Sequence, residues 1–344
     1  MAILLADGFD FYNSGTDMGY VGSPWANVGG GSISLTTPYA VGQSHAINLG
    51  TISATFTSDA TIYLAFTHYS NTAFTGTNTQ GFFIVLQETA GNQVTLHWSL
   101  DGNFYVRGGG TTGTIIAGPF AHGMAANSWC HWQAKVVINN TTGSVELRKN
   151  NNPVDDFSAT NLNTRNGTTN AYANKFTLST VTGTWNIDDL FVNSGSGAVP
   201  NSWPGQLRAI QLMPTADTAQ KDLTPLSGTS NYAMVDELKM DSNTSYVYGA
   251  VAGQTDIYNL ADLTVTPTAI PLVVVRHALA KSDTGARTAT TEIRSGGVTQ
   301  DQAAINLATT YQWQDTYLTV DPNTSAAWTL AGVNALQVGP KVVS

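Results

Sequence analysis

Apolar and polar side chains alternate with a period of two along most of the chain, as in residues 62–67, 94–100 and 132–138. This period is typical of β-strands that bury one face. Turn-forming sequences such as Asp101-Gly102 and residues 139–143 separate the alternating segments. No segment keeps a helical period over three turns, and no heptad repeat is present. The pattern therefore predicts an all-β protein without a coiled-coil stalk.

A length of 344 residues exceeds what one hydrophobic core usually serves, so two domains are expected. Residues 193–204 hold Ser-Gly-Ser-Gly and two prolines, the composition of a linker. We therefore expect a first domain over residues 1–200 and a smaller β-sandwich domain over residues 205–344. In the second domain, the pattern predicts strands at 270–280, 286–294, 311–320 and 335–343, with the first two paired across a turn, and a short helical turn within 326–333.

The last strand of the first domain carries two adjacent carboxylates, Asp188 and Asp189, between apolar residues. If those apolar residues pack in the core, the strand must face at least one of the two aspartates the other way or bend there, and a carboxylate at such a bend needs a partner. Asp7 lies in the first strand, and the first and last strands of a sandwich often lie side by side. Two partners stay open: a structural calcium ion held by Asp7 with Asp188 or Asp189, or backbone N–H groups.

Charge and cysteine content exclude several classes of function. Only 11% of residues are charged, the formal net charge is −9, and the first basic residue is Arg107. Nucleic acid is disfavoured as a partner, because affinity for phosphates rests on Lys and Arg clusters. Cys130 is the one cysteine, so no intrachain disulfide forms, which indicates folding in a reducing cytoplasm. The first residues offer neither a signal peptide nor a membrane span, so no membrane insertion is expected.

Two long strands joined within 138–147 (INNTTGSVEL), closed by 187–192 (IDDLFV), resemble the laminin-G-like or concanavalin-A-like jelly roll over residues 1 to about 200. The whole chain further resembles a class of tailed-bacteriophage virion structural proteins. That resemblance rests on residues 205–217 (GQLRAIQLMPTAD), 294–297 (RSGG) and 321–329 (DPNTSAAWT). It implies a component of the virion rather than a particular chemistry.

Catalytic residues are not expected. Enzymes of the concanavalin-A-like fold that cleave β-glucans usually carry a Glu-x-Asp-x-x-Glu strand, and this chain has none. Glu237 and Asp241 would share a face of a strand, but their backbones would lie roughly 13 Å apart, against about 5 to 10 Å between the carboxyl groups of glycosidase pairs. The histidines show no metal-ligand spacing, and no nucleophile elbow is present. The sequence therefore favours a non-enzymatic protein.

Aromatic side chains in loops are the candidate glycan contacts, because ring faces stack on the C–H surfaces of sugars while Asn and Thr bind hydroxyls. For each such residue, burial in the core stays open as the alternative. The candidates in or near predicted loops are Trp25, Tyr39, Tyr69, Phe74 and Tyr105.

These observations predict a virion structural protein that is made in the host cytoplasm. The leading role is a tail-fibre or tail-tip component that contacts host-surface polysaccharide. The alternatives are a capsid decoration or head-fibre protein and a glycan-degrading tail spike. We expect other tail or capsid proteins as partners and a homo-oligomer, in particular a trimer, because phage appendages attach at symmetric positions and avidity multiplies weak sugar affinities.

Overall fold

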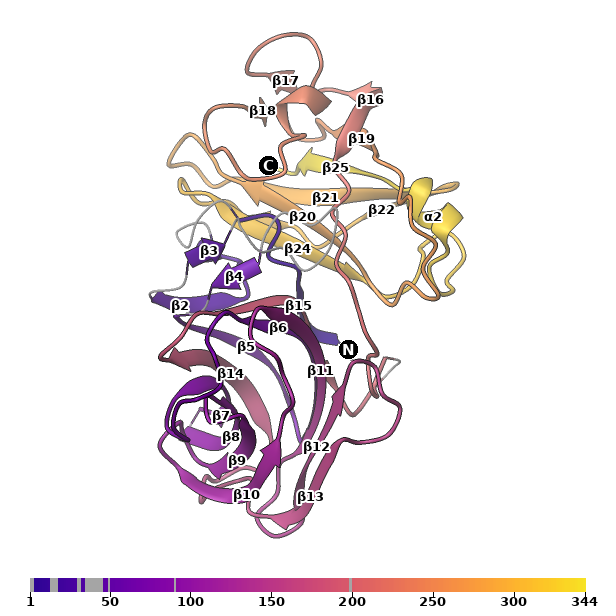
Figure 1. Cartoon of the computed structure of the whole chain (residues 1–344). Helices are drawn as coiled ribbons and strands as arrows, with labels where there is room; N and C mark the ends of the chain where they lie inside the picture. Colours follow the sequence, from indigo (N-terminus) through magenta and orange to yellow (C-terminus); the bar gives the residue numbers. More distant parts are fainter. Residues whose placement is uncertain are drawn as a thin grey trace. The chain divides into compact units, whose positions relative to one another are not determined.

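The computed structural model describes residues 3–12, 18–29, 32–34, 46–48, 50–89, 91–197 and 200–344. In these residues the chain is built almost entirely of antiparallel β-sheets, which confirms the all-β fold class (Figure 1). It forms two compact units. The first extends to Ala209, and the second holds Ile210–Ser344 together with Phe11, Tyr12 and Tyr20–Ser23. No described helix is both long and apolar enough to cross a membrane.

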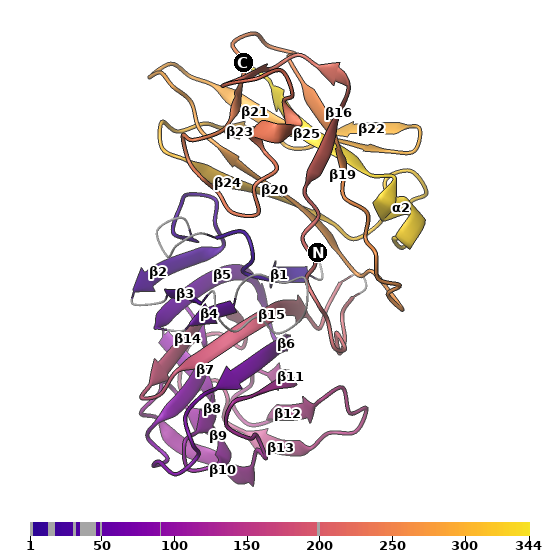
Figure 2. The same cartoon turned by 45° about the horizontal axis from the view of Figure 1, so that its top comes forward.

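Two antiparallel sheets packed face to face form the first unit, the predicted jelly-roll sandwich (Figure 2). The back sheet has the order β13-β12-β11-β6-β15-β4-β3, with β1 also paired to β15, and the front sheet has the order β10-β9-β8-β7-β14-β5-β2. The back strands are β1 (Ile3–Asp7), β3 (Ser32–Ser34), β4 (Ala46–Asn48), β6 (Thr61–Ser70), β11 (Ser128–Val137), β12 (Gly143–Lys149), β13 (Phe157–Leu162) and β15 (Trp185–Ser194). The front strands are β2 (Trp25–Gly29), β5 (Thr51–Asp59), β7 (Gly81–Glu88), β8 (Gly91–Ser99), β9 (Asn103–Gly108), β10 (Thr114–Ala121) and β14 (Ala173–Val181).

Alternate residues of these strands fill the space between the sheets. Trp98 of β8 meets Trp132 of β11 with ring centroids 5.6 Å apart, and Phe66 of β6 lies 5.4 Å from Trp98. All three side chains are fully buried, so the period of two in the sequence marks the core face correctly. The front sheet therefore has a second, outer face, which carries the intervening residues.

The segment expected to be a linker packs on the back sheet of the first unit. The Asn193 side chain donates to the carbonyl oxygens of Pro200 and Ser202, at 3.2 and 2.9 Å. Trp203 lies 5.6 Å from the Tyr63 ring and 3.9 Å from the Arg148 guanidinium. The first unit consequently runs nine residues beyond the expected boundary at residue 200, to Ala209.

The second unit is a smaller β-sandwich with a core of Val275, Ile293, Leu318, Trp328, Val333, Leu336 and Val338. One layer has the order β16-β19-β25-β21-β22, with β23 on β21, and β20 pairs with β24. The elements are β16 (Pro214–Lys221), β17 (Thr224–Pro225), η1 (Tyr232–Met234), β18 (Val247–Tyr248), β19 (Asp256–Leu260), β20 (Val273–Leu279), β21 (Thr288–Ser295), β22 (Val298–Asp301), β23 (Ile305–Asn306), β24 (Gln312–Leu318), α2 (Leu330–Asn334) and β25 (Gln337–Val342).

The four strands predicted in this unit are confirmed, but the expected pairing of the first two is wrong. β20 pairs with β24, whereas β21 pairs with β22, β23 and β25. Residues between β20 and β21 therefore carry the chain from one sheet to another instead of closing a hairpin. Both strands need apolar partners, and alternation alone does not say which strand supplies them.

Candidate functional site

The two aspartates of β15 lie at a β-bulge. The pairing of β15 with β6 shifts register between Asp188 and Phe191, and Asp189 has a φ of 52°. The bulge leaves both side chains buried, at 0% and 3% exposure. Asp188 Oδ1 accepts a hydrogen bond from the Asp189 amide at 2.8 Å, and Asp189 Oδ1 accepts one from the Ala209 amide at 2.7 Å.

Asp7 lies beside this bulge, because β1 pairs with β15 and places Asp7 opposite Leu190. Its Oδ1 accepts from the Phe9 amide at 2.8 Å, and its Oδ2 accepts from the Trp25 indole at 2.9 Å. Over the described residues, no group of three or more His, Cys, Asp or Glu side chains is arranged to hold a metal ion. The sequence left open whether a calcium ion or backbone N–H groups bind these carboxylates. The described contacts of the three aspartates are with backbone and indole N–H groups.

Two of the predicted glycan contacts are core residues, which corrects their assignment to loops. Trp25 begins β2 and is 3% exposed, with its ring against Phe9 and Phe176 at 5.5 and 5.9 Å. Tyr105 lies within β9, is 6% exposed and donates its hydroxyl to Asp101 Oδ2 at 2.7 Å. Neither ring offers an open face to a sugar.

The other predicted contacts do not form a common surface with them. Tyr69 is half-buried in β6, 5.3 Å from the Trp129 ring. Phe74 follows β6 and packs edge-on against His122 at 4.7 Å. Tyr39 lies outside the described residues. No described member of the predicted set lines the pocket to which the structure points.

That pocket lies on the front sheet, where hydrogen-bonding side chains gather. Phe176 and Leu178 of β14 are fully buried, so Lys175, Thr177 and Ser179 project from the opposite, outer face. The register continues this polar face onto β5, whereas β7 adds one polar side chain, Gln87, and the buried apolar side chains of Val85 and Phe83. The pairs are Lys175 with Thr55 and Gln87, Thr177 with Ser53 and Val85, and Ser179 with Thr51 and Phe83.

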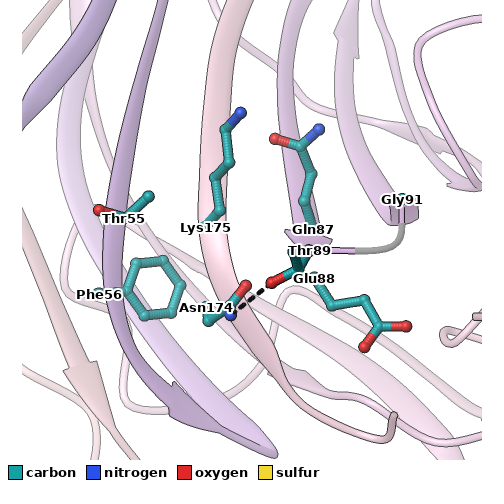
Figure 3. A pocket seen from close by; sticks show the side chains of 8 residues that line it. All are labelled: Thr55, Phe56, Gln87, Glu88, Thr89, Gly91, Asn174 and Lys175. Carbon is teal, nitrogen blue, oxygen red and sulfur yellow. Dashed lines mark hydrogen bonds between the residues drawn. The ribbon is translucent and has the colours of Figure 1, made fainter. Parts of the chain in front are cut away.

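A bulge in β5 opens the pocket at one end of this face. Lys175 pairs with Thr55, yet Ala173 pairs with Asp59, so β5 has two residues more than β14 between these pairs. The pocket there has a volume of about 410 Å³ (Figure 3). It is lined by Thr55, Phe56, Gln87, Glu88, Thr89, Gly91, Asn174 and Lys175.

Hydrogen bonds within the pocket orient its amide groups. Thr177 Oγ1 donates to Gln87 Oε1 at 2.7 Å, and Gln87 Nε2 donates to Asn92 Oδ1 at 2.5 Å. Asn174 Nδ2 donates to Thr89 Oγ1 at 3.3 Å (Figure 3). Each amide keeps a further donor or acceptor for a ligand. The pocket therefore presents fixed polar groups on a rigid sheet.

Phe56 supplies an apolar ring among these polar groups. It is half-buried, and its ring centroid lies 6.0 Å from that of Phe176. In Figure 3 the ring reaches from β5 towards Asn174. The alternation in the sequence marks Phe56 as an ordinary core position, following Ile52 and Ala54. The polar run from Thr57 to Asp59 is the signal that the strand irregularity begins here.

Glu88 is the single carboxylate among the eight lining residues. Asn170 donates two hydrogen bonds to this carboxylate, from its backbone amide to Glu88 Oε1 at 3.2 Å and from its side-chain nitrogen to Glu88 Oε2 at 2.7 Å. Burial opposes ionisation of Glu88, but hydrogen bonds from Asn170, Thr168 and Thr169 together outweigh that effect and lower its pKa. Figure 3 shows its carboxylate turned away from Gln87 and Lys175. Glycoside hydrolysis generally uses a pair of carboxyl groups, and this pocket holds one.

Loop residues close the other half of the outer face, over β8 and β9. Arg107 donates through Nε to His97 Nδ1 at 3.2 Å, through one terminal nitrogen to the Gly113 carbonyl at 3.0 Å, and through the other to the Asn78 carbonyl. His97 Nε2 lies 3.0 Å from the Gln80 carbonyl. Burial lowers the pKa of His97 to about 4, so the ring is neutral at pH 7 and donates from Nε2.

Two other sites considered from the sequence, the Glu237–Asp241 pair and Cys130, are not arranged for catalysis. Glu237 and Asp241 lie outside regular strands, which invalidates the strand spacing used for them. The Ser245 hydroxyl lies within hydrogen-bonding distance of both carboxylates, and its distance to Asp241 Oδ2 is 2.8 Å. Burial raises the pKa of the Cys130 thiol to about 12, which leaves it unreactive at neutral pH.

No family model and no curated protein matches the chain. Solved structures match about half of it. Domain 4 of AbnA, a GH43 extracellular arabinanase from Geobacillus stearothermophilus, in complex with arabinotriose, is 16% identical over 50% of this chain and 79% of its own, with a TM-score of 0.33. The carbohydrate binding module CBM66 from Bacillus subtilis is 10% identical over 51% and 97%, with a TM-score of 0.32.

The exoplasmic/lumenal domain of VIP36, in its Ca²⁺/Man3GlcNAc-bound form, is 12% identical over 53% of this chain and 88% of its own, with a TM-score of 0.33. At these identities and TM-scores, the likenesses assign neither a function nor a site to this chain. The candidate site therefore rests on the geometry of the pocket itself.

Proposed function

We propose that the first unit binds a saccharide in the pocket between β5, β14 and β7. The observation that carries this proposal is that a half-buried ring, Phe56, lines the same pocket as oriented amides and hydroxyls at the end of the front sheet. Sugars present apolar C–H faces and hydroxyl groups together, and a site that binds them needs both kinds of partner. In this pocket Phe56 is the partner for the apolar C–H face of a sugar, and Gln87, Asn174 and Thr55 are the partners for its hydroxyl groups.

The proposed role is binding without hydrolysis, because the pocket holds one carboxylate, Glu88, and Asn170 engages it. We further propose that the chain is a bacteriophage virion structural protein, in a tail fibre or tail tip that contacts host-surface polysaccharide. The resemblance of residues 205–217, 294–297 and 321–329 to such proteins supports a virion component without favouring the tail over the capsid. A trimer would multiply a weak sugar affinity by presenting several copies of the pocket.

Binding of host-surface oligosaccharides tests the function, measured by isothermal titration calorimetry with the whole chain. Phe56→Ala is expected to weaken binding roughly three- to tenfold, as removal of an aromatic contact does. Phe120→Ala is the matched control, because Phe120 is also half-buried but lies on β10, outside the pocket. Equal affinities of the two variants, or release of reducing sugar by the protein, would refute the proposal.

A virion map tests the placement. Density for this chain at the tail end is the expected result. Density on the capsid lattice would instead establish the decoration or head-fibre alternative.

A further inference from the structure

We infer that the saccharide carries a negative charge, which Lys175 binds. This inference rests on the proposed function and specifies the class of ligand. Lys175 belongs to β14, lines the pocket and is half-buried. In Figure 3 its side chain extends beside that of Gln87, on the same side of the sheet.

The neighbours of Lys175 on the sheet are uncharged. Its cross-strand partners are Thr55 on one side and Gln87 on the other. Among the described residues, no carboxylate forms a salt bridge with it. Its ammonium therefore faces the pocket as a cation whose charge the sheet does not neutralise.

A second lysine of the first unit shows the usual arrangement. Lys135 of β11 lies opposite Glu146 of β12, and its Nζ is 2.9 Å from Glu146 Oε1. Opposite charges across strands stabilise a sheet modestly, and a chain with 23 acidic and 14 basic residues has carboxylates available for this purpose. At Lys175 the partner positions hold an amide and a hydroxyl instead.

Gln87 and Glu88 line the pocket with Lys175 and are hydrogen-bonded to other residues, so an anion can bind the lysine ammonium. Gln87 is engaged by Thr177 and Asn92, and the carboxylate of Glu88 is engaged by Asn170 and turned away. An ammonium donates strong hydrogen bonds to a carboxylate or a phosphate oxygen, and it binds both as a point charge. A uronic acid and a phosphorylated sugar share this chemistry, so either can supply the anion.

The test compares charged and neutral saccharides that have the same number of sugar units. Trigalacturonic acid is titrated against galactotriose, and glucose 6-phosphate against glucose, by calorimetry with the whole chain. Both pairs are repeated at low and at high salt. The charged member of at least one pair is expected to bind about five- to tenfold more tightly, and added salt is expected to reduce the difference. The pair that shows it identifies the carboxylate or the phosphate as the preferred anion.

Lys175→Gln is expected to abolish that preference, while Lys135→Gln, the matched control, keeps it. If charged and neutral sugars bind equally and Phe56→Ala weakens both, the proposed function stands and the inference about charge is wrong. If no saccharide binds, or if Phe56→Ala changes nothing, the proposed function itself fails. A preference that survives Lys175→Gln would assign the charge to another residue and overturn the inference.

Discussion

The Asp189 side chain is expected to be a main stabiliser of the first unit, through a conformation that most residues avoid. Its φ of 52° lies in the left-handed region, which Asp and Asn enter more readily than other non-glycine residues. Its Oδ1 accepts the Ala209 amide at 2.7 Å, and the side chain is 3% exposed. One residue therefore shapes the bulge of β15 and holds the end of the first unit.

Three substitutions separate these contributions. Asp189→Ala loses a charge-assisted hydrogen bond worth about 1.5–3 kcal/mol and adds about 1 kcal/mol of backbone strain, so the free energy of unfolding should fall by about 2.5–4 kcal/mol. Asp189→Gly loses the bond but relieves the strain, and about 2 kcal/mol is expected. Asp189→Asn keeps an acceptor and tolerates the backbone, and should cost about 1 kcal/mol.

Urea denaturation with a fluorescence signal from the tryptophans of the first unit measures these values. Asn161→Ala is the control for strain alone, because Asn161 is exposed and has a φ of 58°. If Asp189→Ala costs no more than Asn161→Ala, the hydrogen bond to Ala209 contributes nothing and the reasoning fails. Chelation is expected to leave the melting temperature unchanged. A calcium-dependent melting temperature that Asp189→Ala loses would establish the metal alternative instead.

Three further results are expected. Asp315→Leu leaves the buried Arg276 without the carboxylate that binds it at 2.7 Å, and should lower the unfolding free energy of the second unit by about 3–5 kcal/mol. Adding Arg276→Met should recover most of that loss in urea titrations, and no recovery would argue against a buried-charge penalty. A chain restricted to residues 210–344 lacks Tyr12, whose hydroxyl accepts a hydrogen bond from Arg276 at 2.9 Å. Its melting temperature should therefore be lower than that of the second unit in the whole protein. Equal melting temperatures would show that Tyr12 is dispensable. The pKa of His97 in the folded protein is about 4, below its ordinary value, so its contribution to the free energy of unfolding is fully present above about pH 6.5 and is lost as the pH falls towards 4. The loss amounts to roughly 3 kcal/mol, and the fall of stability with pH should be shallower in His97→Gln. An unchanged pH dependence in that variant would exclude His97 as its source.

The sequence by itself determined the strands and which residues of each strand face the core. Alternation placed Trp98 and Trp132 in the core correctly, because a period of two is a local property of extended backbone. The adjacent aspartates 188 and 189 likewise indicated a bend in β15 and a need for partners, since an apolar strand cannot bury two neighbouring carboxylates without them. Pairing of the first and last strands of the unit followed from the sandwich.

Tertiary structure decided the pairing of strands, and with it the candidate site. Trp25 and Tyr105 looked accessible next to turn-like sequences, but Trp25 packs against Phe9 and the distant Phe176, and Tyr105 is buried on β9 between β8 and β10. Phe56, Gln87 and Lys175 meet only because β14 lies between β5 and β7 in a particular register with a bulge. A strand with a given alternation fits several partners equally well, so its neighbours depend on how all the strands pack together. That packing, rather than any local motif, places a lysine with uncharged cross-strand partners in the same pocket as an aromatic ring.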